Sequence, residues 1–87
     1  MSRYFYLKIY DYNGKKNICG QRVYEARTRA HITQFDLAAK LQVSGVNIER
    51  DSISKIESCK RFVADYEVVA LAKILNVSVL WLLGIEE

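Results

Sequence analysis

The segment ERDSISKIESCKR, residues 49–61, groups side chains whose types suit contact with nucleic acid. On a helix that turns about 100° per residue, Ile53 and Ile56 fall on one face. The opposite face carries Arg50, Asp51, Ser54 and Lys55, and its flanks carry Ser52 and Glu57. Arginine and lysine can donate to guanine, aspartate can accept from cytosine, and serine suits phosphate oxygens. A solvated face on an ordinary surface helix is the alternative, because charged outward faces are common.

A second element, just before this segment, favours the nucleic-acid interpretation. Thr33, Gln34 and Asp36 form a helix start of the capping-box kind, with Asp where Glu is commoner. The apolar spacing of the two predicted helices suits a helix-turn-helix unit, in which the second helix enters the major groove of DNA. Lys60 and Arg61 follow that helix, where they would meet the DNA backbone.

The whole chain has the size and composition of one small globular domain. It has 87 residues, of which 51% are hydrophobic and 26% charged, and its formal net charge is +3. We expect a single domain over 1–87, with an N-terminal strand or arm at 1–16 and a helical bundle at 17–84. The net charge is only a weak indication of an anionic partner, because the placement of charges matters more than their sum.

The first residues alternate as a β-strand does. Over residues 4–10, one face carries Phe5, Leu7 and Ile9. Asn13-Gly14 follows as a strong turn signal, and residues 15–18 are a short second arm. Two interpretations remain open, a hairpin or a lone strand that pairs with a copy of itself.

Five helices are predicted after the turn, so the fold class is all-α. Their ranges are 17–30, 33 to about 41, 49–57, 65–75 and 79–83. Asn17, Thr33 and Ser78 are the expected N-terminal caps, and Asn76 and Gly84 the expected stops. Apart from the two isoleucines above, the expected inward residues are Ile18, Val23, Ala26 and Ala30, then Phe35, Leu37, Ala38 and Leu41, then Tyr66, Val69, Ala70, Leu71 and Ile74.

Several classes of protein do not fit this sequence. Cys19 and Cys59 have no ligand spacing around them, and His31 is the only histidine, so we expect no metal site and reduced thiols. No apolar run is long enough to span a bilayer, and the N-terminus lacks a signal-peptide pattern, so we expect a cytoplasmic protein. No catalytic motif or phosphate loop is present, so we expect no enzyme, no cofactor and no small-molecule ligand.

Residues 20–83 resemble the Cro/lambda-repressor (XRE-type) helix-turn-helix regulators. The motifs that carry the resemblance are GQRVYEAR (20–27), ITQFDLAAKL (32–41), ISKIES (53–58) and LAKILNVSVLWLL (71–83). The resemblance implies a compact five-helix lambda-repressor-like domain. It also implies DNA contacts from Gln34, base reading by Arg50, Asp51 and Lys55, and backbone contacts from Ser52, Lys60 and Arg61. With the capped helix start and the outward face, the expected DNA-binding residues are Thr33, Gln34, Arg50, Asp51, Ser52, Ser54, Lys55, Lys60 and Arg61.

The resemblance further implies that Arg27 and Glu57 form a structural ion pair. The chain departs from the family pattern in two places. The connector within LQVSGVNIER is longer than the usual tight turn, which leaves two interpretations open: the first helix of the unit runs on through Val43, or Gly45 leads a looser loop. Cys59 stands where the family usually has Gly, at a position that often needs a left-handed backbone conformation. A small hydrophobic filler and a redox sensor are the two interpretations of Cys59.

These observations predict a sequence-specific double-stranded DNA-binding transcriptional repressor that binds a palindromic operator as a homodimer. The candidate dimer surfaces are the N-terminal strand, with Phe5, Leu7 and Ile9, and the C-terminal residues Leu80, Trp81, Leu83 and Ile85. The alternative is a protein-interaction module or antitoxin-type partner protein on the same fold. Glu49 and Asp51 on the outward face favour that alternative, because carboxylates repel phosphate.

Overall fold

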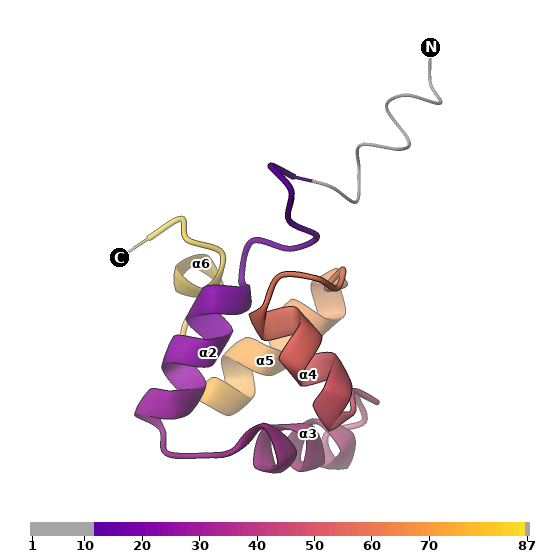
Figure 1. Ribbon diagram of the computed structural model, residues 1–87. Coiled ribbons are helices and arrows are strands. Elements are labelled where there is room, and N and C mark those ends of the chain that lie inside the picture. The colour runs from indigo at the N-terminus through magenta and orange to yellow at the C-terminus, as the bar shows by residue number, and fades with distance from the viewer. Residues whose placement is uncertain (1–11, 87) are drawn as a thin grey trace.

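The structure is a computed structural model that describes residues 12–86. Within that range, five helices follow one another, in agreement with the all-α prediction (Figure 1). They are α2 (Gly20–Arg29), α3 (Gln34–Val43), α4 (Arg50–Glu57), α5 (Asp65–Leu75) and α6 (Val79–Leu82). The strand predicted for residues 4–10 lies outside the described residues.

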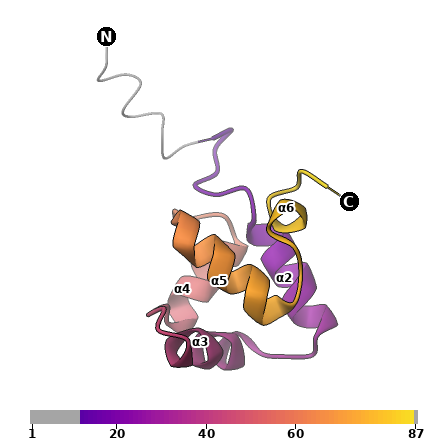
Figure 2. The ribbon, with the colours of Figure 1, turned by 180° about the vertical axis from the view of Figure 1, so that it is seen from behind.

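The helices pack around α2, which contacts α4, α5 and α6. α3 contacts both α4 and α5, and it lies across one end of the bundle (Figure 1). Seen from behind, α5 crosses the rear of the bundle on the side away from α4 (Figure 2). α4 therefore has its inner side on α2 and α3 and its outer side open to solvent.

The core is formed by aliphatic side chains from every helix. Ile53 and Ile56 are fully buried, as the sequence predicts for α4, and so are Val23, Leu37 and Leu41. Ile48, in the connector before α4, is buried as well, and nothing in the periodicity of its segment indicated that. Cys19 packs in this core, and burial raises the pKa of its thiol to about 11, so it stays protonated near neutral pH.

The prediction of which side of α5 faces the core is wrong, because the buried side is shifted by about one residue along the sequence. Tyr66 and Val69 are exposed, whereas Val68, Ala72 and Leu75 are buried together with Leu71. The sequence DYEVVALAKIL is apolar nearly all round, so its pattern selects no face. Packing against α2, α3 and α6 selects one instead. Phe35, also predicted to face inward, is 67% exposed at the start of α3.

The first helix is shorter than predicted, because Asn17 lies two residues before the N-cap and accepts hydrogen bonds from the first backbone N–H groups of the helix. The N-cap residue is Cys19, and the Asn17 Oδ1 accepts from the backbone N–H groups of Cys19 (3.1 Å) and Gly20 (2.8 Å). Ile18 and Ala30, predicted to face the core, lie outside α2 and are exposed.

The amide of Asn17 has a second use that the sequence did not indicate. Its Nδ2 donates to the carbonyls of Ile56 (3.1 Å) and Arg61 (2.8 Å), at and beyond the end of α4. Asn17 is only 9% exposed, so one buried side chain joins the start of α2 to the exit of α4.

The other helix ends follow the predictions closely. Thr33 and Asp36 form the capping box, with bonds of 3.0 and 3.2 Å, and Ser78 caps α6 through the N–H of Trp81. Asn76 ends α5 with a φ of 58°, and Cys59 has the expected left-handed φ, 63°. α3 runs on through Val43 and then turns at Gly45, whose φ is 93°, so both features proposed for the long connector are present.

We predict that Asn17→Asp lowers the free energy of unfolding by about 1 to 3 kcal/mol, because a carboxylate cannot donate to the two buried carbonyls. The same change keeps the side-chain oxygen that accepts from the start of α2, so the loss of stability reports only the hydrogen bonds that the Asn17 amide donates at the end of α4. Urea unfolding at neutral pH measures it, with Asn47→Asp in the exposed connector as the matched control. Equal stability of the two variants would contradict this role of the amide.

Candidate nucleic-acid interface

The ion pair between Arg27 and Glu57 joins the end of α2 to the end of α4, as the family resemblance implies. The Nε of Arg27 lies 2.6 Å from Oε2 of Glu57, and Nη2 lies 3.1 Å from Oε1. The remaining Nη1 donates to the carbonyl of Ile32 (2.9 Å), in the connector to α3. The two side chains are 11% and 6% exposed. The hydrogen bond with Glu57 raises the pKa of Arg27, against the lowering effect of burial.

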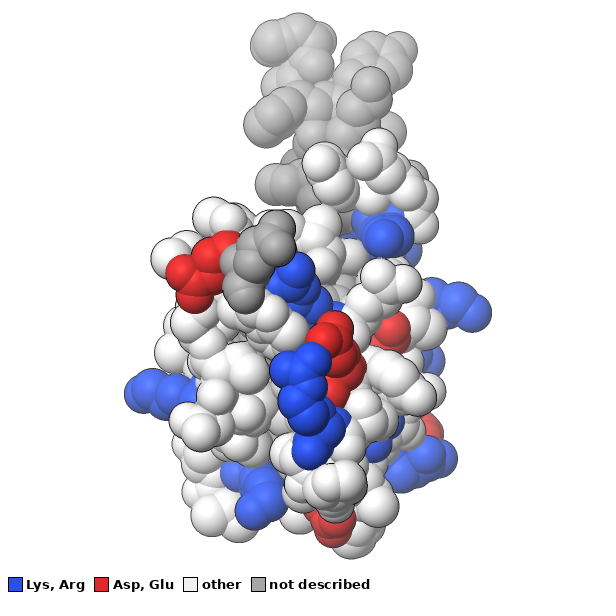
Figure 3. Space-filling view, turned by 90° about the vertical axis from the view of Figure 1, so that its left-hand side faces the viewer, with Lys and Arg blue, Asp and Glu red and all other residues white. Residues whose placement is uncertain are grey.

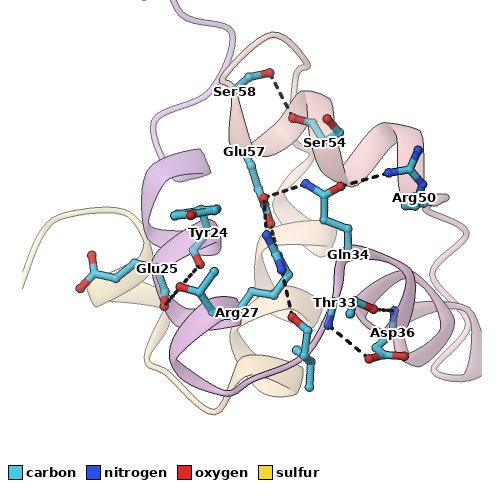
Figure 4. A network of polar contacts seen from close by, with 12 residues as sticks. Tyr24, Glu25, Arg27, Thr33, Gln34, Asp36, Arg50, Ser54, Glu57 and Ser58 are labelled. Carbon is cyan, nitrogen blue, oxygen red and sulfur yellow. Dashed lines mark hydrogen bonds and ion pairs between the residues drawn. The ribbon is translucent and has the colours of Figure 1, made fainter.

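Gln34 extends this pair toward the start of α4. Its Nε2 donates to Oε1 of Glu57 (3.0 Å), and its Oε1 accepts from Nη1 of Arg50 at 3.4 Å (Figure 4). Arg50 also approaches Oδ1 of Asp51 at 3.4 Å. Both contacts of Arg50 are long, so its exposed guanidinium can exchange them for another acceptor at little cost. The amide of Gln34 is oriented by a buried carboxylate, and it presents its carbonyl to Arg50.

Seven of the nine predicted DNA-binding residues lie on α4 or at the start of α3. Arg50, Asp51, Ser54 and Lys55 are exposed on the outer side of α4, and Ser52 is half-buried at its flank. Thr33 and Gln34 open α3 beside the start of α4, and they line a shallow hollow with Arg50. Thr33 is already engaged in the capping box. The structure therefore brings together the beginnings of α3 and α4. The hydrogen bond between Gln34 and Arg50 joins residues that are sixteen positions apart in the sequence.

Arg61 has a partner that sequence reasoning missed. Its Nη1 and Nη2 donate to the two carboxylate oxygens of Glu67, at 2.9 and 3.2 Å, and Nη1 also donates to the carbonyl of Phe62. The Arg61 side chain is 27% exposed. Its expected contact with a DNA backbone stays a prediction, but its guanidinium is already engaged. A spacing of six residues across a loop matches no helical periodicity, so the sequence carried no signal for this pair.

The surroundings of Glu67 favour its ionised form. Burial raises the pKa of this carboxyl, but the hydrogen bonds from Arg61 and from the N–H of Ala64 (3.0 Å) outweigh burial, and the net pKa is lowered. In return, the hydrogen bond with Glu67 raises the pKa of Arg61. The pair fixes the loop between α4 and α5.

The C-terminal residues offered as a dimer surface do not form one open patch. The guanidinium carbon of Arg22 lies over the ring of Trp81, 4.7 Å from the ring centroid, and that of Arg29 lies 5.9 Å from the same centroid. Arg22 also donates to the carbonyl of Trp81. Trp81 and Leu83 pack against the core, whereas Leu80 and Ile85 are 48% and 69% exposed. The candidates Phe5, Leu7 and Ile9 lie outside the described residues.

The side of the molecule formed by α2 intermixes acidic and basic side chains (Figure 3). Such a surface favours no single sign of partner charge. Among residues 12–86, no group of three or more His, Cys, Asp or Glu could hold a metal ion, and no helix is long and apolar enough to cross a membrane.

We predict that Glu67→Gln lowers the free energy of unfolding by about 1 to 3 kcal/mol at neutral pH, because it leaves the Arg61 charge without its counter-ion. The matched control is Glu25→Gln, which breaks the exposed ion pair with Arg29 and should cost about 0.5 kcal/mol or less.

The loss should also depend on pH. The folded pKa of Glu67 is lowered, so its contribution to stability is complete above the ordinary carboxyl pKa of about 4.3 and is lost as pH falls through the folded pKa. The stability gap between wild type and Glu67→Gln should shrink below about pH 4 in urea titrations. A gap that stays constant down to pH 2 would contradict the assignment.

Comparison with solved structures finds a match to this fold. The chain superposes on the crystal structure of the P22 c2 repressor in complex with a synthetic operator, with a TM-score of 0.67 and 26% sequence identity. The match covers 80% of this chain and 98% of that one. That protein is a helix-turn-helix repressor of the Cro/lambda type. No protein-family model matches the sequence, and no curated protein matches it.

Proposed function

We propose that this chain, whose fold is that of the Cro/lambda-type helix-turn-helix repressors, is a sequence-specific repressor that binds double-stranded DNA in the cytoplasm. The observation that carries the proposal is the outer face of α4. It is polar and exposed, and it belongs to a fold that a repressor also has in complex with its operator DNA.

In the proposed complex, α4 lies in the major groove and its outer face meets the base edges. Arg50 donates to guanine, with its guanidinium presented by Gln34, and Lys55 donates one turn later. Asp51 accepts from cytosine and rejects bases that offer only acceptors there. Ser52 and Lys60 hold phosphates and supply affinity that depends on salt. The role is one of binding, with no chemical step.

The first experiment is a selection from random DNA duplexes, followed by a salt titration on the enriched sequence. We expect a palindrome whose half-sites lie about one helical turn apart, with affinity that falls steeply as salt rises. No enrichment, with weak binding lost at moderate salt, would reject the proposal. It would favour the protein-interaction alternative, to which the exposed Glu49 and Asp51 already point.

We predict that Arg50→Ala relaxes the preference at one base position of the selected site and costs about 1 to 3 kcal/mol of binding free energy. Lys60→Ala should instead weaken all sequences alike and reduce the salt slope by about one. Binding of both variants to the selected duplex and to its single-base variants separates the two effects. Identical behaviour of the two variants would reject the division between base reading and backbone contact.

The proposed active form is a homodimer, and Leu80 and Ile85 are the C-terminal dimer candidates that are exposed. We predict that Leu80→Glu/Ile85→Glu gives a monomer by sedimentation equilibrium and weakens binding to the palindrome. Val43→Glu, at a residue that is 89% exposed at the end of α3, is the control and should leave the mass unchanged. A double variant with wild-type mass would place the interface elsewhere.

A further inference from the structure

The residues just before α2 form a closed turn. Asn13 and Gly14 have φ values of 52° and 79°, and Tyr12 and Lys15 exchange two backbone hydrogen bonds of 2.7 and 2.9 Å. Positive φ at both central residues is the geometry of the type I′ turn, for which Asn-Gly is the favoured sequence. The turn holds Lys15 and Lys16 in a fixed piece of backbone.

This turn is fastened to the exit of α4. The N–H of Lys16 donates to the carbonyl of Cys59 (2.9 Å), and the next residue, Asn17, donates to the carbonyls of Ile56 and Arg61. Three hydrogen bonds therefore join residues 16–17 to residues 56–61. Lys60, which is proposed to hold the DNA backbone, lies inside that segment.

Among the described residues, the arginines have partners within the protein, whereas the lysines form no ion pairs. Each arginine in residues 12–86 is engaged by a carboxylate or, for Arg22, by backbone carbonyls and the Trp81 ring. No lysine in the same range takes part in an ion pair. Lys15, Lys16 and Lys60 are all exposed, so three cations without a carboxylate partner lie on two segments that are hydrogen-bonded to each other.

We propose that the turn formed by residues 12–16 is a second phosphate-binding segment, in which Lys15 and Lys16 contact the DNA backbone next to Lys60. The proposal rests on the proposed function. Phosphates recur along each strand at about 3.4 Å of helix axis, so a basic segment fixed beside Lys60 meets phosphates adjacent to the one that Lys60 holds. Lysine suits this role because its ammonium is a point charge on a flexible stem and needs no fixed geometry.

The turn also explains how a chain with a net charge of only +3 binds a polyanion. The binding face gains two cations from outside the helix-turn-helix unit. The match covers 98% of the repressor chain in that structure but 80% of this chain, so part of this chain has no counterpart in the matched structure.

The test is a salt titration of Lys15→Gln/Lys16→Gln on the selected duplex. The matched control is Lys40→Gln/Lys73→Gln, in the last turns of α3 and α5, where both lysines are exposed. Each double variant removes two positive charges, which lowers the formal net charge from +3 to +1. Thermal melting checks that both variants remain folded.

We expect the slope of log affinity against log salt to fall by about 0.9 per lost contact, hence by about 2, in Lys15→Gln/Lys16→Gln, with base preference unchanged. The control should keep the wild-type slope. A wild-type slope in Lys15→Gln/Lys16→Gln, or an equal fall in the control, would overturn the inference while the proposed function stands. A wild-type protein with no salt-dependent affinity for any duplex would overturn both.

Discussion

The ion pair between Arg27 and Glu57 is the constraint on which the proposed binding face depends. Three nitrogens of the Arg27 guanidinium are engaged, two by Glu57 and one by the α2–α3 connector, so α2, α4 and that connector are fixed together. The same carboxylate orients Gln34, and Gln34 presents its carbonyl to Arg50. A buried interaction thereby sets the geometry of an exposed one. Loss of either charge would strand the other in a buried site, which typically costs about 3 to 5 kcal/mol.

Arginine and lysine have different uses in this molecule. Three arginines are structural, because the planar guanidinium forms paired hydrogen bonds in Arg27 with Glu57 and in Arg61 with Glu67, and in Arg22 it stacks on Trp81. The lysines of the described range are left for solvent or a partner. The cationic character of the proposed interface therefore depends on a few lysines and on Arg50, whose own contacts are long. This division is consistent with affinity that is strongly dependent on salt and specificity that resides in a few side chains.

The exit of α4 is fixed by contacts from two directions. The side chain of Asn17 and the backbone N–H of Lys16 donate to carbonyls at and just beyond the end of α4, and Arg61 is held by Glu67 near the start of α5. Cys59 keeps a left-handed conformation within this loop, at a cost of about 1 kcal/mol for a residue with a Cβ. A rigid exit places Lys60, and with it the turn at residues 12–16, at a constant position relative to the outer face of α4.

The sequence alone determined the features that depend on local chemistry. The capping box at Thr33, the cap at Ser78, the stop at Asn76 and the two faces of α4 were all predictable, because each depends only on residues within or next to one helix. The family resemblance, carried by four motifs, also predicted the fold and the pair of Arg27 with Glu57. Only the tertiary structure decided which side of α5 is buried, since a helix that is apolar nearly all round takes its orientation from its neighbours. It likewise decided the partners of Asn17 and Arg61, because neither the 39 positions between Asn17 and Ile56 nor the six between Arg61 and Glu67 correspond to the period of a single helix.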